Sequence, residues 1–411
     1  MTKKSDAPAI RFKGFSDAWE QRKVSDLAEK TYGGGTPTTS NEAYWNGDIP
    51  WIQSSDVVDG KLLGVEPRKW ITQDGLNNSA AQLIPGNSIA IITRVGVGKL
   101  AFMPYSYATS QDFLSLSKLN AEPLFTVYAC YKKLQSELNA VQGTSIKGIT
   151  KDELLAKNIM VPRYAEQQQI GAFFKQLDNL ITLHQRKFEK LTNVKKSMLE
   201  KMFPQNGSSY PEIRFKGFTD PWEQRKLGDI GKARSGVGFP DADQGGVTGV
   251  PFFKVSDMNL DGNENEMIVA NNYVTAEQIA DHRWSPITEL PAIFFAKVGA
   301  AVMLNRKRLC RFPFLLDNNT MAYSLSPTKW DADFAKALFG TVDLTSLVQV
   351  GALPSYNAGD VESMGIYLPS LFEQEQIGAF FKLLDNLITL HQRELEKLQN
   401  IKKSMLEKMF V

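Results

Sequence analysis

The stretch EQQQIGAFFKQLDNLITLHQRKFEKLTNVKKSMLEKMFP, residues 166–204, decides the fold of this chain. From Ile170 onward its apolar residues recur every seven positions, a pattern typical of a long helix that packs against another helix. Roughly 38 helical residues at 1.5 Å each extend about 57 Å, which is longer than an ordinary domain is wide. The stretch therefore predicts a spacer helix, with a core helix of a compact bundle as the alternative.

The same stretch occurs again at the end of the chain. Residues 373–411 match residues 166–204 with 32 of 39 residues identical. A shorter box, residues 10–23, returns as residues 213–226 and differs at two of fourteen positions. Such repetition predicts two copies of one structural plan, and it favours spacers over a bundle. Because each short box must follow a long stretch in the same way, we expect the two chain termini to lie close together.

Each predicted helix presents one apolar stripe, and the two stripes would pack against each other or against a docked partner. A histidine at the same place in each stripe could set the register, or could make one ordinary hydrogen bond. The candidate seam or docking residues are Ile170, Phe173, Leu177, Leu180, His184 and Leu191 in the first copy, and Ile377, Phe380, Leu384, Leu387, His391 and Leu398 in the second.

The segments between the repeats diverge, and they predict two mixed α/β (α+β) domains in a pseudo-two-fold arrangement. Short β-branched and aromatic runs, such as residues 88–93 and 292–296, alternate with turn residues and with a helical pattern at residues 125–138. Repeated segments should meet the same partner twice, whereas divergent segments should meet two different ones. The expected division is a first domain (1–160), a first helix (161–204), a linker (205–212), a second domain (213–367) and a second helix (368–411).

Composition excludes several classes of protein. A hydrophobic content of 43% in 411 residues is enough for more than one core. Cys130 and Cys310 lie far apart and have no histidine or cysteine at metal-ligand spacing, which argues against a zinc module and a disulfide framework. The first eight residues lack the apolar run of a signal peptide, and no later stretch is apolar for long enough to span a membrane. We expect a cytoplasmic protein that holds no metal.

Catalytic motifs do not fit the sequence. Residues 96–100, GVGKL, resemble a phosphate loop, but a leucine follows Lys99 where a Ser or Thr belongs. We find no Gly-x-Ser-x-Gly, His-Glu-x-x-His or Asn-Pro-Pro-aromatic motif, and the chain has only three histidines. We therefore interpret the chain as a binding protein without a cofactor of its own; an enzyme with an unfamiliar site is the alternative.

Glycine-rich loops follow both short boxes, at residues 31–41 and 233–240. Hydroxyl, amide and arginine side chains on such loops suit base edges and phosphates, although the loops could also be simple connections. Residues 306–308 form a basic cluster that suits a phosphate contact or a solvated turn. The candidate DNA-binding residues are Thr31, Tyr32, Thr36, Thr38, Thr39, Arg94, Lys99, Arg234, Ser235, Lys254, Lys297, Arg306, Lys307 and Arg308.

Net charge weighs against a DNA-binding role, because such proteins usually carry a basic excess. The chain has a formal charge of only +2. Residues 26–160 hold 12 Lys and Arg against 13 Asp and Glu, and residues 229–365 hold 11 against 16. Any basic surface must therefore be local.

The order of these segments resembles the specificity subunits of Type I restriction-modification systems, and the resemblance covers essentially the whole chain. The second domain departs from it, because its loop reads GVGFP at residues 236–240 where the first domain has GGTP. The motifs that carry the resemblance are Pro162 with EQQQI at 166–170, Pro369 with EQEQI at 373–377, and GGTP at 34–37 before IPWI at 49–52.

The resemblance implies a non-catalytic subunit in which each domain reads one half of a split, asymmetric target in double-stranded DNA. Antiparallel helices would set the gap and dock two methyltransferase subunits, which methylate adenine N6 with S-adenosylmethionine. Restriction subunits that use ATP and Mg would join through the complex, and all of these cofactors would bind to the partners, with no membrane involved. The alternative is a non-DNA scaffold or adaptor with two ligand-binding domains on a coiled-coil spacer. Salt-dependent retention on DNA distinguishes the two.

Overall fold

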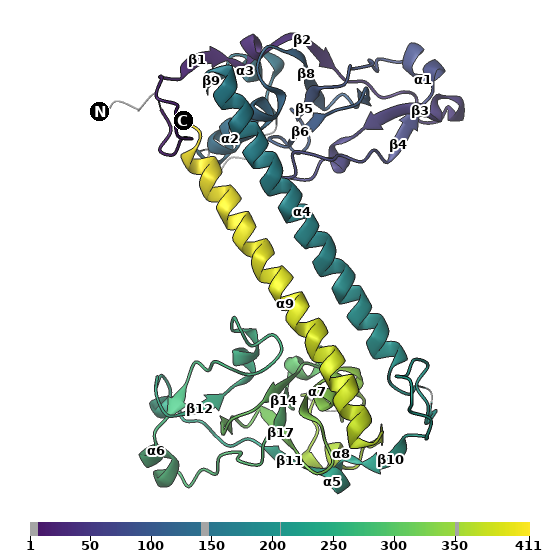
Figure 1. The fold of residues 1–411 in the computed structure, drawn as a ribbon, viewed down its shortest axis with the longest axis vertical. Coiled ribbons are helices and arrows are strands. Elements are labelled where there is room, and N and C mark those ends of the chain that lie inside the picture. Colours follow the sequence, from purple (N-terminus) through teal and green to yellow (C-terminus); the bar gives the residue numbers. More distant parts are fainter. Residues whose placement is uncertain (1–6, 141–147, 206, 350–352) are drawn as a thin grey trace. The chain divides into compact units, whose positions relative to one another are not determined.

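Two compact units make up the fold, and each of them contains part of both long helices (Figure 1). Unit 1 comprises residues 1–186 and 392–411, and unit 2 comprises residues 187–391. The boundary between the two units therefore falls inside both long helices, at residues 186/187 and 391/392. The residues that this computed structural model describes are 7–140, 148–205, 207–349 and 353–411.

Small sheets form the β-structure of unit 1. Its strands are β1 (Glu20–Lys23), β2 (Ala28–Gly33), β3 (Trp45–Ile52), β4 (Lys69–Ile71), β5 (Ser88–Ile92), β6 (Leu100–Met103), β7 (Ala108–Thr109), β8 (Phe113–Leu119) and β9 (Asn158–Val161). An antiparallel sheet has the order β2-β8-β5-β6, and a mixed sheet has the order β4-β3-β7. Strand β1 pairs with β9. The run predicted at residues 88–93 is confirmed as the central strand β5, which is buried throughout.

The helices of unit 1 include one predicted from the sequence and one that starts with a capping box. The predicted helix at residues 125–138 is confirmed as part of a longer one. One short helix starts with a capping box, in which the Glu153 amide donates to the Thr150 hydroxyl and the Thr150 amide donates back to the Glu153 carboxylate. The helices and turns are η1 (Val24–Leu27), η2 (Glu42–Tyr44), η3 (Ser54–Asp56), α1 (Gln73–Asn77), α2 (Pro123–Ala140), α3 (Lys151–Leu155) and α4 (Tyr164–Lys201).

Unit 2 repeats this plan. Its strands are β10 (Glu223–Lys226), β11 (Gly231–Ser235), β12 (Val250–Phe253), β13 (Tyr273–Val274), β14 (Ala292–Ala296), β15 (Lys307–Cys310), β16 (Leu315–Leu316), β17 (Thr320–Leu325) and β18 (Gly365–Leu368). The order β11-β17-β14-β15 reproduces β2-β8-β5-β6, and β13-β12-β16 reproduces β4-β3-β7. The predicted α/β plan in two copies is confirmed, although the two sequences have diverged. The helices and turns are α5 (Leu227–Ile230), η4 (Asp241–Asp243), η5 (Val255–Asn259), α6 (Ala276–Asp281), η6 (Ala300–Leu304), α7 (Ala332–Thr341), η7 (Leu344–Leu347), α8 (Ala358–Glu362) and α9 (Leu371–Lys408).

The first turn of each long helix is fixed to its own unit by a buried ion pair. In unit 1 the Arg11 guanidinium donates two hydrogen bonds, of 2.9 and 2.7 Å, to the buried Glu166 carboxylate. In unit 2 Arg214 makes the same pair of bonds to Glu373, at 2.6 and 2.7 Å. Each bond pair joins a short box to a helix start, which explains why these two repeated segments are retained together.

A glycine lets each long helix approach its domain closely. A Cβ atom on Gly171 would lie 2.5 Å from Glu122 Oε2 and 2.9 Å from the Phe125 amide nitrogen. A Cβ atom on Gly378 would lie 2.2 Å from Asp331 Oδ1. Only glycine fits at these two positions, so the helices are packed onto the domains rather than tethered to them.

The last turn of each long helix belongs to the core of the other helix's domain. Phe410, just beyond α9, packs against Phe125 and Phe174 of unit 1, each with a centroid distance of 5.7 Å. Phe203, just beyond α4, packs in the same way against Phe334 and Phe381 of unit 2. The C-terminal ends of the helices are therefore parts of two hydrophobic cores, not only spacers.

Within each unit the two helices run antiparallel and are joined by one equivalent ion pair. In unit 1 Lys402 lies 2.6 Å from Asp178, and the residues that follow Lys402 pack against residues that precede Asp178. In unit 2 Lys195 lies 2.5 Å from Asp385. The antiparallel pairing that we expected is confirmed within each unit.

The first described residues and the last helix of the chain meet in unit 1, as the repeat predicts. The Ile10 amide donates to the Lys408 carbonyl at 3.0 Å, and Figure 1 shows the C-terminus beside the N-terminal segment. The Ile213 amide makes the equivalent bond to the Lys201 carbonyl at 2.9 Å. The connection that the chain makes through its linker in unit 2 is thus replaced in unit 1 by a close contact between two ends.

The predicted seam residues divide according to their position along the helices. Near the helix starts Ile170, Leu177, Ile377 and Leu384 are buried in domain cores. Toward the middle, Leu180 is 37% exposed. The remaining candidates are half-buried: Phe173 and Phe380 against Phe12 and Phe215, Leu191 and Leu398 beside the cores, and Leu387, His184 and His391.

Candidate nucleic-acid interface

The glycine-rich loop of unit 1 is anchored at its base by close backbone packing. The Gly35 amide donates to the Thr109 carbonyl at 2.8 Å, and the Trp51 indole donates to the Gly35 carbonyl at 3.0 Å. A Cβ atom on Gly34 would lie 1.8 Å from the Ser110 carbonyl oxygen. Close backbone contact therefore requires glycine at position 34.

The tip of this loop exposes the hydroxyl groups of Thr36, Thr38 and Thr39. The Thr36 hydroxyl donates to Gln111 Oε1 at 2.6 Å, and the Trp45 indole donates to the Thr38 carbonyl at 3.2 Å. These bonds hold the tip in one conformation while leaving hydroxyl groups available to a ligand.

Lys69 on β4 lies beside the loop and is not among the residues predicted from the sequence. Its ammonium lies 5.5 Å from the Trp45 ring centroid and 5.8 Å from that of Trp51. The same two tryptophans hold the loop, so a cation is positioned next to the hydroxyl-bearing tip. Lys69 lies next to the loop only because β4 pairs with β3 in the folded chain. No sequence signal within the loop indicates this pairing.

Two other candidates in unit 1 lie in β2, before the loop. Thr31 and Tyr32 are half-buried, and Tyr32 packs against a hydrophobic cluster below the Lys30 ammonium. Beyond β5, Arg94 is exposed and Lys99 is half-buried. The structure therefore brings the threonines of the tip together, whereas Arg94 and Lys99 follow the end of another strand.

The loop of unit 2 is anchored at the same place. The Gly236 amide donates to the Thr320 carbonyl at 3.1 Å, and a Cβ atom on Gly236 would lie 1.8 Å from the Asp317 carbonyl oxygen. Phe239 stacks on Phe252 with a centroid distance of 3.7 Å. Although its sequence departs from the GGTP pattern, this loop uses the same kind of glycine contact as the loop in unit 1.

The charged candidates around the second loop are held by neighbours. Arg234 forms an ion pair with Glu289 at 3.2 Å, and Lys254 donates to Gln244 Oε1 at 3.1 Å. Ser235 is exposed, and the half-buried Lys297 follows β14 as Arg94 follows β5. The two units thus present different side chains on one framework.

The basic cluster at residues 306–308 is not a solvated turn. Lys307 begins β15, and its ammonium donates to Asn305 Oδ1 and to the Val342 carbonyl. Burial lowers the pKa of Lys307 to about 8. The Arg308 guanidinium donates to the Asn263 carbonyl, and burial, followed by the like charge of Arg306, lowers the pKa of Arg308. Arg306 donates to Asn259 Oδ1 at 2.6 Å.

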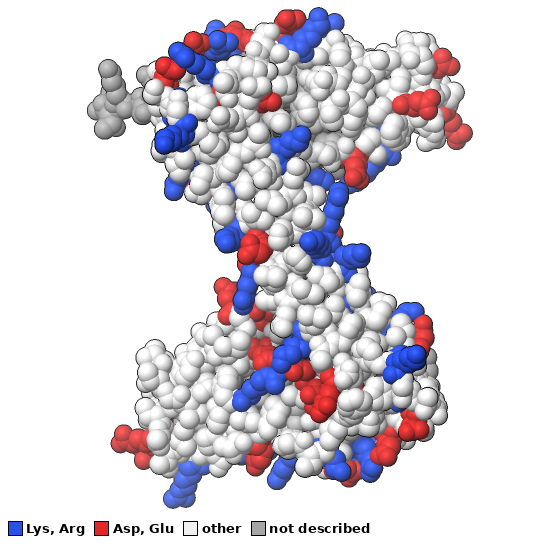
Figure 2. Space-filling model, viewed as in Figure 1, with Lys and Arg blue, Asp and Glu red and all other residues white. Residues whose placement is uncertain are grey.

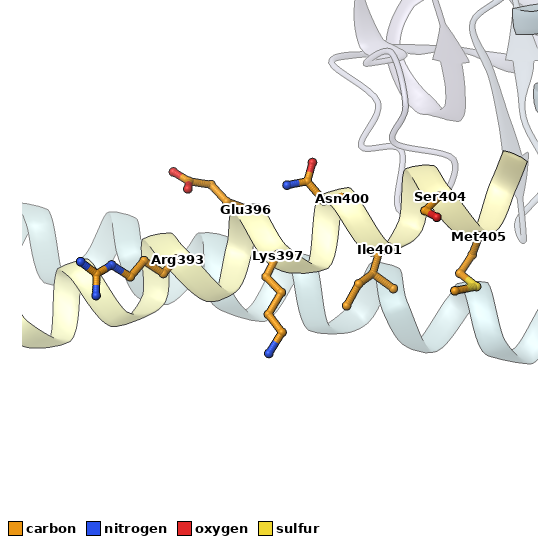
Figure 3. Close-up of a pocket in the computed structure, with 7 residues that line it drawn as sticks. All are labelled: Arg393, Glu396, Lys397, Asn400, Ile401, Ser404 and Met405. Atoms are coloured by element: carbon orange, nitrogen blue, oxygen red, sulfur yellow. The ribbon is translucent and has the colours of Figure 1, made fainter. Parts of the chain in front are cut away.

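A shallow pocket lies along α9 in unit 1 (Figure 3). In that view Lys397 and Ile401 point to one side of the helix, whereas Glu396 and Asn400 point to the other. Six of its seven residues are identical at the equivalent positions of α4, and the seventh is Val194 in place of Ile401. A surface retained in both copies is suited to a partner that is met twice. The lining residues are Arg393, Glu396, Lys397, Asn400, Ile401, Ser404 and Met405.

Charges are interspersed over the drawn face of each unit. Figure 2 shows Lys and Arg alternating with Asp and Glu, so the described residues of this face form no large patch of one sign. The local character of any basic surface, as expected from the sequence, fits this view. Within the described ranges, no group of three or more His, Cys, Asp or Glu residues is placed to hold a metal ion. A search of the same residues finds no helix that is both long and apolar enough to cross a membrane.

Comparisons with known proteins agree with one another. The Type I restriction enzyme MjaIX specificity subunit of Methanocaldococcus jannaschii is 24% identical over 407 residues, covering 95% of this chain and 92% of the relative. The EcoR124I/EcoR124II specificity subunit of Escherichia coli is 31% identical over 159 residues, covering 37% of this chain and 39% of that subunit.

Solved structures share the fold. The S subunit of the Type I restriction-modification system from M. genitalium aligns with a TM-score of 0.64 at 16% identity, covering 98% of this chain and 99% of that one. A chain from a structure of type I R-M system assembly and conformational transition aligns with a TM-score of 0.51 at 15% identity, covering 95% and 97%.

A family model described as the Type I restriction modification DNA specificity domain matches the chain twice, over residues 16–193 and 219–400. The two matches correspond to the two copies of the repeated plan. They favour a DNA-recognition role over the scaffold alternative. Specificity subunits recognise DNA and do not catalyse a reaction. The chain belongs to the family of Type I restriction-modification DNA specificity subunits.

Proposed function

We propose that each unit reads one half of a bipartite, asymmetric target in double-stranded DNA, and that the long helices set the gap between the halves. The observation that carries this proposal is the pair of loops anchored alike at Gly34 and Gly236 but carrying different exposed side chains. One framework with two sets of side chains suits two different half-sites. Each helix, at about 57 Å for 38 residues, exceeds one DNA turn of about 34 Å.

Residues at the loop tips are the proposed base readers. Hydroxyl groups can donate to or accept from base edges, so Thr36, Thr38 and Thr39 are proposed for unit 1 and Ser235 for unit 2. Cations near the loops are proposed as phosphate contacts, which orient the protein without reading sequence. These cations are Lys69, Arg94 and Lys99 in unit 1 and Arg234, Lys254, Lys297 and Arg306 in unit 2.

Two methyltransferase subunits are the proposed partners of the repeated surfaces. Support comes from Leu183 and Leu390, equivalent leucines that are 46% and 51% exposed on α4 and α9. Exposed leucines at equivalent sites suit two copies of one partner. In this proposal the partners methylate adenine N6 with S-adenosylmethionine, and restriction subunits that require ATP and Mg join through the complex. Because chromosomal DNA is the target, the proposed location is the cytoplasm.

A domain exchange tests the bipartite proposal. Residues 215–365 would be replaced by the corresponding segment of another specificity subunit, and the hybrid would be co-expressed with the methyltransferase. Genome-wide mapping of N6-methyladenine should show one half of the target changed and the other half unchanged. A change in both halves would contradict independent reading by the two units. Exchange for a nearly identical segment provides the control for assembly.

A further inference from the structure

Unit 2 contains a polar hollow of about 220 Å³, and Arg306 is the one residue of its charged lining that the proposed function already uses. It lies where β15 meets α7 and the two long helices, and the basic cluster at residues 306–308 forms one wall. Residues from β15, α4, α7, α9 and the segment before Met267 converge here. Its charged lining consists of Lys195, Glu264, Arg306, Lys307, Arg308, Asp333, Lys336, Lys382 and Asp385.

Cations outnumber carboxylates in this lining by six to three. The Asp385 carboxylate is already bound by Lys195 at 2.5 Å and by Lys336 at 2.7 Å. The Asp333 carboxylate is likewise bound by Lys382 at 2.9 Å and by Arg311 at 2.5 Å. Each aspartate is therefore shared between two cations, and positive charge is left over.

Part of the excess charge is half-buried. The Lys307 ammonium has carbonyl and amide oxygens as its hydrogen-bond partners, and burial lowers its pKa to about 8. The pKa of Arg308 is also lowered, by burial and then by the neighbouring charge of Arg306. An anion in the hollow would relieve both effects, because it would favour the charged forms.

The equivalent residues of unit 1 differ in their chemistry. Strand β6, which occupies the place of β15, reads LAFM instead of KRLC. Asp178, the equivalent of Asp385, is bound by one cation, Lys402, and by the Tyr128 hydroxyl at 2.6 Å. Two of the cations, Lys307 and Arg308, are therefore supplied by a strand whose counterpart in unit 1 is apolar.

We propose that this hollow binds a phosphate group, supplied either by inorganic phosphate or by a phosphodiester of the DNA backbone. Arginine and lysine donors that converge from several elements suit a tetrahedral oxyanion, which accepts charge-assisted hydrogen bonds on every side. Arg306 and Lys382 provide donors that are not buried in a core, and Lys336 provides a third from α7. The phosphodiester source rests on the proposed function, whereas the free-phosphate source does not.

Calorimetric titration of the full chain with inorganic phosphate, at constant ionic strength set with potassium chloride, provides the first test. The variants are Arg306→Gln and Lys382→Gln. The matched control is Lys175→Gln, because Lys175 is the equivalent of Lys382 on α4 and does not line this hollow. Each variant should weaken phosphate binding by roughly tenfold, as expected for one lost charge-assisted bond, while Lys175→Gln should not. Thermal unfolding confirms that all three proteins fold.

Duplex DNA binding at several salt concentrations distinguishes the two sources. For a phosphodiester, each variant should reduce the salt slope by roughly one, and the control should not. If the hollow binds only free phosphate, the variants should bind phosphate more weakly and should keep the wild-type salt slope of DNA binding. The proposal is overturned if wild type shows no phosphate binding and the salt slopes are unchanged, or if the variants bind phosphate as Lys175→Gln does. If the wild-type chain showed no sequence-specific DNA binding, that result would instead contradict the proposed function.

Discussion

At the scale of single residues, Lys307 shows how tertiary structure changes the meaning of a motif. The sequence Arg306-Lys307-Arg308 indicates an exposed basic cluster, but alternation along β15 turns the Lys307 ammonium toward the Val342 carbonyl. The sequence of residues 306–308 does not indicate that Lys307 points inward. Alternation along a strand decides which side chains point inward only once the strand is packed in its sheet. Arg306, by contrast, lies before the strand and donates to Asn259 Oδ1 at 2.6 Å.

Lys307 should make stability depend on pH. Its pKa is about 8 in the folded chain and 10.5 in the reference state. Between these values the unfolded chain binds more protons, so the free energy of unfolding rises with pH from about 8 to 10.5. Below about pH 8 Lys307 is charged in both states, and the full free-energy cost of burying its ammonium is present. Denaturant titrations at several pH values should show this rise in wild type and not in Lys307→Met. A parallel rise in the variant would exclude Lys307 as its cause; exposed Lys232→Met serves as the control.

Gly378 should be irreplaceable for a steric reason. In Gly378→Ala the new Cβ would meet Asp331 Oδ1 at 2.2 Å and the Phe334 amide nitrogen at 2.7 Å. We expect a loss of about 1–3 kcal/mol in the free energy of unfolding, from urea titration. Gly340→Ala is the matched control, because Gly340 is helical, exposed and has no atom within 4 Å of its Cβ position. Equal effects of the two substitutions would contradict the close-packing argument.

At the scale of elements, the heptad pattern predicts the two long helices well but not what their ends do. The pattern reports an apolar stripe, and an apolar stripe can pack against a helix or a sheet domain. Both occur here: Phe174 is buried by Phe410, and Ile170 by the domain core. The glycine loops were predicted as candidates from composition, whereas Lys69 required knowledge of strand pairing.

The end of α9 should stabilise the N-terminal domain. Phe410 packs against Trp19, Phe125 and Phe174, all in unit 1. In Phe410→Ala we expect a loss of about 3–5 kcal/mol, as for other buried phenylalanines. Hydrogen exchange should show lower protection in β1 and α2, with the sheet of unit 2 unchanged. Phe372→Ala is the control, because Phe372 is 63% exposed. Unaltered exchange in β1 would show that α9 does not complete this core.

At the scale of the whole chain, one structural plan occurs twice. The contact between Ile10 and Lys408 in unit 1 is equivalent to the contact between Ile213 and Lys201 across the linker in unit 2. The Ile10 and Ile213 amides bind equivalent carbonyls at the ends of α9 and α4. Residue identity in the repeats predicts this equivalence, and the structure confirms it in each unit. Because the sequences of the two domains have diverged, the strand order that they share is visible only in the structure.

A circular permutant tests this equivalence. The chain would begin at Ile213, and a copy of residues 205–212 would join Val411 to Ile10. Because the bond from Ile10 to Lys408 already brings these ends together, we expect the permutant to retain the wild-type midpoint of denaturation. A strongly lowered midpoint would show that the ends are not equivalent to the linker. Wild type with the same extra residues at its C-terminus is the control.

The most direct test of the central claim is methylome mapping. This chain would be co-expressed with the methyltransferase subunit of its system, and N6-methyladenine would be mapped across the host genome. We predict one new motif made of two different half-sites separated by a fixed gap. Scattered methylation without a common motif, or no new methylation despite a stable complex, would contradict the claim that this chain selects the DNA target through its two units.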